Sequence, residues 1–488
     1  MDNRNLGPCP WQPLRFNTGK KELLLAAVVL ILSLLLVNSF LYAGVNLGFT
    51  VWYSLLLWVC VFYLLRSNRK LTGYSGALLL LSQVLILGFA RSDDMPVKAV
   101  IVGFVIVGVN LSFSIMAGHS RENTGSIRSL LDAAKVFFTQ GFRMPESFRG
   151  IAAAFQAGGK TIKNTLSVLG GLCIAVPVLV VLILLLSQAD AAFQGILNLL
   201  PAFDGNQLLI TLVFGFGAAC YFYTRAVALR HNAPQAPQTV AEPLQMRPIT
   251  VNTVLICVCV VYAAYLVSQL AYFLGGFSGI LPEGFTMAQY ARRGFFEMAW
   301  LCVLNLGLMV GAISLVKKDN SRLTRGLCLF IGLMTLLLVT TASAKMLLYI
   351  DSFGLTRLRV LTEVIIVFLG LTTLFVSIWL LAPKLPYMRC ILLTALLLGG
   401  VVIWADVDTV VARYNVTAYQ EGKLETVDIA YLSRLSAGAR PYLVKLAEDP
   451  DPAVAKTARY HLAQSEQEYY RDLRGWNWAA ANAARFLK

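Results

Sequence analysis

Long apolar segments alternate with short polar ones over the first 405 residues of this 488-residue chain. Most of the apolar runs are close to 20 residues long, which is the length that a helix rising 1.5 Å per residue needs to cross a hydrocarbon core of about 30 Å. The pattern predicts an all-α, polytopic bundle of about 11 transmembrane helices. The runs cover approximately 22–43, 45–65, 71–90, 97–118, 166–187, 207–228, 250–275, 295–316, 326–346, 359–381 and 388–405.

The segment after residue 405 has a different pattern, with short amphipathic stretches separated by turn residues. Asp428 and the pair Asp451-Pro452 are typical helix-start residues, and Leu443 and Leu446 offer a small core. We therefore expect a helical C-terminal domain outside the membrane. The predicted organisation is a cytoplasmic N-terminus (1–21), a four-helix membrane part (22–118), a cytoplasmic amphipathic segment (119–165), a seven-helix membrane core (166–405) and an extracytoplasmic helical domain (406–488).

Some stretches between the predicted spans are long enough to have a role of their own. Segment 126–157 mixes apolar and basic residues at helical spacing, which suits an amphipathic helix on the inner leaflet in contact with anionic lipid. A helix packed beneath the bundle fits the same pattern, and both interpretations stay open. Segment 188–203 is apolar but too short to span, and 232–248 is a Pro- and Gln-rich linker.

Composition agrees with a membrane protein. The chain is 57% hydrophobic and 14% charged, whereas soluble domains carry about 25% charged residues. Its formal net charge of +15 needs no nucleic-acid partner, because the basic residues gather in alternate loops, as expected for loops on the cytoplasmic side. This asymmetry places the N-terminus inside. With an odd number of spans it places the C-terminus outside, where segment 406–488 has as many basic as acidic residues.

Charges at the ends of the predicted spans are the main candidates for a functional site, because a charge in the membrane is costly and seldom accidental. In the predicted topology these candidates gather on the outer side. They either bind a charged ligand in an outward-open cavity or form ion pairs that fix the helices, such as Arg293 with Glu297 and Arg359 with Glu363, each four residues apart. The ligand-binding candidates are Arg292, Arg293, Glu297, Lys345, Arg359, Glu363, Asp190 and Asp351.

No catalytic template fits the chain, so no catalytic residue and no cofactor are expected. His119, His231 and His461 are the only histidines, and they have no metal-ligand spacing. Asp406 and Asp408 lie at a membrane end and are weak candidates for holding a divalent ion, since two carboxylates are too few for a cage.

Several motifs mix charge, glycine and aromatic residues at membrane ends, and they resemble a family of bacterial membrane proteins. The motifs are SQADAAF (187–193), AYFLGG (271–276), AQYARRGFFEM (288–298), SAKMLLYIDSFGLTRLRV (343–360), ARYNV (412–416), DIAYLSRLS (428–436) and RGWNWAAANA (474–483). The family is domain of unknown function 4173, with the related 4153. The residue before Tyr290 is often Glu in that pattern and is Gln289 here. The resemblance implies a bacterial inner-membrane location and supports the topology and the outer-face residues, but no activity.

Three functions fit these observations. The leading hypothesis is a non-enzymatic transport or signalling component that binds a charged or lipid-like ligand at its outer face. One alternative is a membrane enzyme acting on a lipid-linked substrate at the outer leaflet. Another is a structural subunit, with a further membrane protein as its partner.

Overall fold

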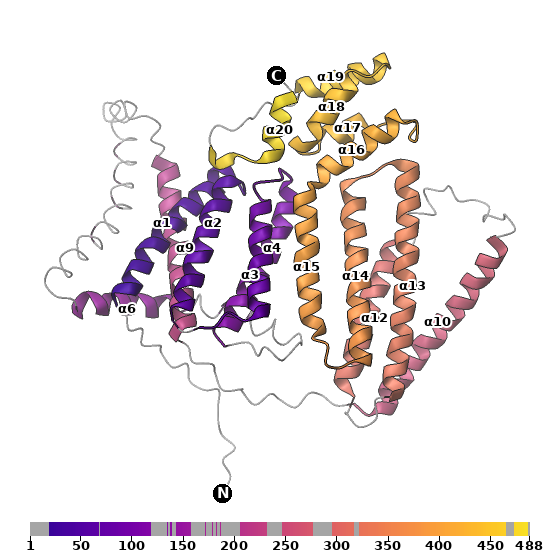
Figure 1. Ribbon diagram of the computed structural model, residues 1–488, viewed down its shortest axis with the longest axis horizontal. Helices are drawn as coiled ribbons and strands as arrows, with labels where there is room; N and C mark the ends of the chain where they lie inside the picture. Colours follow the sequence, from indigo (N-terminus) through magenta and orange to yellow (C-terminus); the bar gives the residue numbers. More distant parts are fainter. Residues whose placement is uncertain are drawn as a thin grey trace, which may run out of the picture.

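The computed structural model describes residues 19–67, 69–118, 143–157, 205–231, 246–276, 295–316, 322–464 and 473–486, with single positions at 134, 137, 138, 171, 178, 182 and 186. Long helices run up and down between two faces of an elongated bundle, and a group of short helices lies on one of these faces (Figure 1). We call the face that carries the short helices the C-terminal face, and the other the opposite face. The long helices are α1 (Lys20–Ala43), α2 (Leu47–Leu65), α3 (Gly73–Gly88), α4 (Met95–Met116), α9 (Gly205–His231), α10 (Pro248–Gly276), α12 (Phe295–Leu315), α13 (Arg322–Phe353), α14 (Arg357–Leu381) and α15 (Tyr387–Ala405).

The long helices confirm the predicted class of an all-α polytopic membrane bundle. Within the described residues, nine of them are long and apolar enough to cross a membrane. Helix α3 is apolar but has only 16 residues, so at 1.5 Å per residue it is about 24 Å long. The predicted run 166–187 and the segments 188–203 and 232–245 lie almost wholly outside the described residues.

Two groups of helices meet along α15 (Figure 1). Helices α1, α2, α3, α4 and α9 pack together on one side, and α10, α12, α13 and α14 on the other, while α15 contacts α3, α4 and α14. The approach of α15 to α3 is close because α3 ends in Gly88. A Cβ atom at that position would lie 2.6 Å from Cγ2 of Ile403, so only a glycine allows the two backbones to approach this closely.

Polar side chains join the helices within each group. At the opposite face, Arg230 of α9 forms an ion pair with Glu22 of α1, and Tyr63 of α2 donates a hydrogen bond to the same carboxylate (3.2 Å). In the second group, Asn305 of α12 accepts a hydrogen bond from Tyr262 of α10 and donates one to Thr335 of α13, each at 2.9 Å. These bonds satisfy polar groups that hydrocarbon would leave unpaired, so they help to select the packing of the helices.

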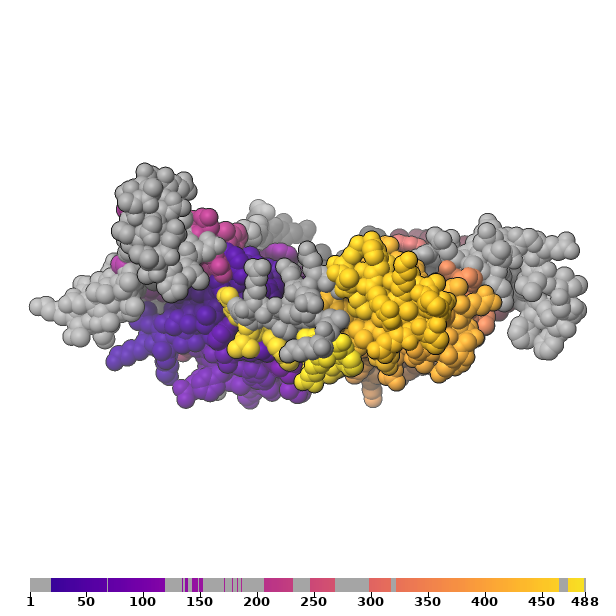
Figure 2. Space-filling view, turned by 90° about the horizontal axis from the view of Figure 1, so that it is seen from above, coloured from indigo at the N-terminus to yellow at the C-terminus, as the bar shows by residue number. Residues whose placement is uncertain are grey.

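The short helices on the C-terminal face form a unit that we call the cap. Its helices are α16 (Val407–Gln420), α17 (Ile429–Ser433), α18 (Arg440–Ala447), α19 (Pro452–Gln464) and α20 (Trp478–Phe486). As predicted, Asp428 and Asp451 accept hydrogen bonds from the backbone N–H groups of Tyr431 and Ala453 (2.8 and 2.9 Å), and Leu443 and Leu446 lie in a core. Seen from above, the cap covers the middle of the bundle and its last residues extend over the N-terminal helices (Figure 2).

The amphipathic segment predicted at 126–157 is described mainly in its second half. Residues 144–157 form α6 (Met144–Ala157), which packs against α9 and lies across the opposite face rather than along the bundle (Figure 1). A helix that lies across the ends of spanning helices is in the orientation expected for the membrane interface. Whether it contacts anionic lipid stays a prediction.

Candidate functional site

A cluster of buried charges joins the cap to both groups of helices at the C-terminal face. We call Asp94, Lys98, Arg357, Asp406 and Asp408 the charge cluster. Asp94 precedes α4, Arg357 begins α14, and the two other aspartates flank the turn between α15 and α16. The exposed fractions of the Asp94, Lys98, Asp406 and Asp408 residues are 2% or less, whereas the side chain of Arg357 is 26% exposed.

Local sequence signals place each acidic group. Asp94 caps α4, its Oδ1 accepting a hydrogen bond from the backbone N–H of Val97 (3.3 Å), and Pro96 follows within the first turn. Asp406 ends α15 and starts α16 with φ of 55°, a left-handed conformation that Asp adopts more readily than most residues. This turn changes the chain direction and brings Asp408 to the start of the cap.

Arg357 is the centre of the cluster. Its Nε and Nη2 donate hydrogen bonds to Oδ1 and Oδ2 of Asp408 at 2.9 and 2.6 Å, a bidentate arrangement that is among the strongest side-chain pairings. The backbone N–H of Ser436, in the cap, donates to the same Oδ2 (2.7 Å). Arg357 therefore links α14 to the cap through Asp408, both of whose carboxylate oxygens accept hydrogen bonds.

Asp94 is held less completely than Asp408. Its Oδ2 lies 3.1 Å from Nε of Arg357, but the Nε–H group donates to Asp408 instead, and Oδ2 has no hydrogen-bond partner. Burial and the charges of Asp408 and Asp406 raise the pKa of Asp94 to about 6, although Arg357 opposes the shift. Asp94 is therefore a carboxyl group that can gain a proton in mildly acidic conditions.

Asp406 is also buried but has two side-chain donors. Ser92 Oγ donates to its Oδ1 (3.0 Å) and Thr409 Oγ1 to its Oδ2 (2.6 Å). Burial raises the pKa of this carboxyl group, and the two hydrogen bonds act in the other direction. Because the oxygens of Asp406 and Asp408 are already bonded within the protein, neither is free to hold a divalent ion as it stands. Among the described residues no group of three or more His, Cys, Asp or Glu side chains is arranged for a metal.

The last described residues of the chain bond to loops that lie beside the charge cluster. Lys98, which is fully buried, donates to Oδ1 of Asn46 (2.6 Å), and Asn477 donates to Asp93 (2.9 Å). The backbone N–H of Trp478 donates to the carbonyl oxygen of Ala90 (2.8 Å). The tail is thus bonded to the loops before α2 and α4, and the cap contacts both groups of helices.

The structure distributes the candidates predicted from the sequence rather than joining them into one cavity. Glu363 accepts a hydrogen bond from Ser343, while Arg359 donates to the carbonyl oxygens of Phe353 and Gly354 and lies 4.1 Å from the ring of Tyr349. Arg359 and Glu363 therefore have separate partners instead of the expected pairing.

The other candidates are placed as follows. Asp351 is exposed and accepts a hydrogen bond from Tyr414 (3.3 Å), and Lys345 is half-buried on α13. Arg292, Arg293 and Asp190 lie outside the described residues, and for Glu297 only the backbone is described, within α12. The proposed ligand role of this set is untested.

Sequence reasoning overlooked two members of the charge cluster, Lys98 and Asp94, and a third charge elsewhere in the bundle, Arg225; a signal was present for each. Lys98 is a charge inside the predicted span 97–118, which by itself marks a candidate. Arg225 is likewise a charged residue inside a predicted span, 207–228. Asp94 precedes Met-Pro and an apolar run, which is a helix-start pattern. Only the fold, however, brings Asp94 to Arg357, 263 positions away in sequence.

The comparisons with known proteins assign the chain to a family. No match was found among curated proteins or solved structures. Residues 14–446 match the family described as Domain of unknown function (DUF4153). The motifs resemble domain of unknown function 4173 and the related 4153. The family model that matches is the one for 4153. Since it covers most of the sequence, this chain belongs to the DUF4153 family.

Proposed function

We propose that this protein is a non-enzymatic signalling or transport component of a bacterial inner membrane, and that the charged ligand at its outer face is a proton taken up by the charge cluster. The observation that carries the proposal is the position of Asp94 Oδ2, which is buried against Arg357 without a hydrogen bond. A protein that moves or signals needs an element with two arrangements whose balance a ligand can change. The junction of cap and bundle is that element.

The carboxylates that face Asp94 favour a loosening of the junction when the proton leaves, and the cations Arg357 and Lys98 oppose it. Asp408 and Asp406 face it from the α15–α16 turn, Arg357 faces it from α14, and Lys98 lies one turn further along α4. Asp93 and Arg91 precede it in its own loop. Ionised Asp94 adds a third buried carboxylate that repels the other two, whereas protonated Asp94 removes the repulsion and leaves the Arg357–Asp408 pair intact.

The distribution of charge supports an outer position for the cap. Basic residues lie at the helix ends of the opposite face, among them Lys20, Arg69, Arg230, Arg322 and Arg389. Loops rich in Lys and Arg are typically cytoplasmic. We therefore assign the C-terminal face to the outside of the membrane. The cap is then exposed to the pH of the medium outside the cytoplasm.

Hydrogen–deuterium exchange of the full chain in lipid nanodiscs tests the proposal. Exchange is measured at pH 5.5 and 7.5 and divided by the intrinsic rate at each pH. We expect peptides covering 354–360 and 428–440 to exchange several-fold more slowly at pH 5.5, because protonated Asp94 tightens the junction. In Asp94→Asn, which keeps the helix cap but never ionises, the slow exchange is expected at both pH values.

The matched control is Asp351→Asn, which removes an exposed carboxylate on the same face and leaves the charge cluster unchanged. It is expected to keep the full pH response. If the wild-type protein shows equal corrected rates at both pH values, or if Asp94→Asn keeps the response, the charge cluster is not a proton site.

A structural subunit is the second candidate, and one observation favours it. The carboxylate oxygens of Asp406 and Asp408 are bonded within the protein. This is expected of a junction that only fixes the cap to the bundle and does not respond to a ligand. This alternative predicts exchange that is independent of pH, so the same experiment separates it from a proton-responsive component. The engagement of the same oxygens leaves the enzyme hypothesis without an observation in its favour.

A further inference from the structure

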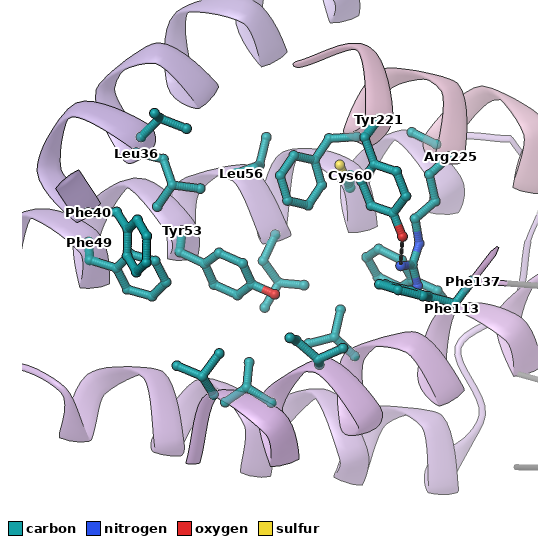
Figure 3. A pocket seen from close by; sticks show the side chains of 18 of the residues that line it. Leu36, Phe40, Phe49, Tyr53, Leu56, Cys60, Phe113, Phe137, Tyr221 and Arg225 are labelled. Atoms are coloured by element: carbon teal, nitrogen blue, oxygen red, sulfur yellow. Dashed lines mark hydrogen bonds between the residues drawn. The ribbon is translucent and has the colours of Figure 1, made fainter. Parts of the chain in front are cut away.

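An elongated apolar cavity lies inside the N-terminal group of helices, away from the charge cluster. Its volume is about 320 Å³, at the lower end of the usual range for small-molecule sites. Side chains of α1, α2, α4 and α9 line it, with aromatic rings at both ends (Figure 3). On α2 the lining runs from Phe49 to Cys60, eleven positions and so about 16 Å along the helix axis, roughly the depth of one leaflet of the hydrocarbon core.

One end of this cavity contains a guanidinium group. Arg225 of α9 is 6% exposed. It donates to the hydroxyl of Tyr221 (3.3 Å) and to Oδ1 of Asn110. The rings of Phe113 and Phe137 lie 5.4 Å from its Cζ atom. Figure 3 shows Arg225 with Tyr221, Phe113 and Phe137 at the end of the row of apolar side chains.

The described partners of Arg225 carry no negative charge. Its Nε is buried without a hydrogen-bond partner, and among the described residues no carboxylate pairs with it. An unpaired charge in a low-dielectric interior is costly, and an ionisable residue inside a membrane protein is usually retained for a function. The missing counter-charge and the missing acceptor are both what an anionic ligand would supply.

We propose that this cavity binds a single-tailed lipid anion, a long-chain fatty acid whose alkyl chain lies between α2 and α4 and whose carboxylate pairs with Arg225. The cavity is elongated and mostly apolar, with the Tyr53 hydroxyl along its length and the guanidinium group at one end, so its shape suits one alkyl chain. A carboxylate matches the planar fork of a guanidinium. The compact headgroup also suits the end of the cavity at Arg225, because that residue is nearly buried. This site is independent of the proton site, because it lies inside the helices and not beneath the cap.

Binding of radiolabelled palmitate to the purified full chain in detergent tests the proposal. We expect saturable binding at one site, and at least tenfold weaker binding of hexadecanol, which has the same tail without the charge. Arg225→Met, which keeps an unbranched side chain but removes the guanidinium group, is expected to weaken palmitate binding at least tenfold. Val105→Phe, which fills the cavity from α4, is expected to weaken palmitate and hexadecanol alike.

Matched controls separate these effects from general damage. Arg66→Met removes an exposed arginine at the end of α2, and Val107→Phe enlarges an exposed side chain two positions from Val105. Both are expected to bind palmitate as the wild type does. If Arg225→Met does not fold, the comparison of palmitate with hexadecanol and the Val105→Phe variant still decide the proposal.

Three results would overturn it: no saturable palmitate binding, equal affinity for palmitate and hexadecanol, or unchanged affinity in Val105→Phe. Displacement of palmitate by phosphatidylglycerol at equal or lower concentration would show instead that the site takes a two-tailed phospholipid.

Discussion

At the scale of single residues, Asp94 combines two roles that act in opposite directions. Its Oδ1 stabilises the start of α4 as a helix cap, while its buried negative charge is opposed by Asp406 and Asp408. The first role needs only an oxygen that accepts a hydrogen bond, and the second depends on ionisation. The two can therefore be separated by replacing the carboxyl group with an amide.

This separation gives a prediction about stability and pH. The pKa of Asp94 is raised from 3.8 to about 6, so the folded state binds the proton more tightly than the unfolded state. The resulting stabilisation is fully present below the unfolded pKa and is lost as the pH rises through about 6. When the pH is lowered from 7.5 to 5, the protonation of Asp94 should raise the free energy of unfolding by about 1 kcal/mol.

Thermal unfolding in detergent at a series of pH values measures this contribution as the difference between wild type and Asp94→Asn. The variant should be the more stable of the two at pH 7.5, and its advantage should shrink towards pH 5. An unchanging difference across this range would mean that Asp94 does not titrate there.

Helix caps could be predicted from the sequence, whereas contacts between distant charged residues could not. Asp428 and Asp451 were predicted as helix caps because a cap depends on neighbours within three or four positions. The pairing of Arg357 with Asp94 and Asp408 depends on the packing of three separate segments, and no local pattern encodes it. Arg359 and Glu363 have the right spacing for a pair, but closer partners from neighbouring segments take both of them.

At the scale of elements, the turn between α15 and α16 is held from the cap side by a close backbone contact. Gly438 lies against Asp406 and Thr409, and a Cβ atom there would be 2.5 Å from Oδ2 of Asp406 and still closer to Thr409 Oγ1. The cap approaches the turn this closely only because position 438 has no side chain.

Gly438→Ala is therefore expected to push the cap away from the turn and to cost about 1–3 kcal/mol of stability, as overpacking usually does. Thermal unfolding measures the cost, and faster trypsin cleavage after Arg434 reports the loosened cap. Gly307→Ala is the control, since nothing lies within 4 Å of that position in α12. Cleavage of Gly438→Ala at the wild-type rate would show that the close contact is not needed.

Element boundaries were predictable where the apolar run and the helix coincide, and not elsewhere. The predicted span 388–405 agrees with α15 to within one residue. The predicted span 326–346 is much shorter than α13, which covers Arg322–Phe353. The apolar run marks only the part of a helix that needs lipid or core around it. The polar turns carrying Arg322 and Asp351 continue the helix beyond that part, because backbone hydrogen bonds do not depend on hydropathy.

At the scale of the whole molecule, the start of α1 and the cap lie on opposite faces of the bundle (Figure 1). Together with the basic residues of the opposite face, this predicts a cytoplasmic N-terminus and an extracytoplasmic C-terminus. The two ends can be tested in the full-length chain without altering any helix.

Alkaline phosphatase, which is active only outside the cytoplasm, should be active when fused after Lys488 and inactive when fused before Met1. A fluorescent protein that matures only in the cytoplasm should give the reverse result. Comparable phosphatase activity from both fusions, or activity from the N-terminal fusion alone, would refute this orientation.

The attachment of the tail to the first helices has a consequence for how the chain is made. Leu47 N–H bonds to the carbonyl oxygen of Trp476, and the carbonyl oxygens of Ala90 and Arg91 accept from Trp478 and Ala479. The ribosome produces the loops before α2 and α4 several hundred residues before their partners. Until residues 476–479 have been made, the backbone groups of these loops lack the partners that the folded protein gives them, so the packing around the first helices is completed only after the cap has been synthesised.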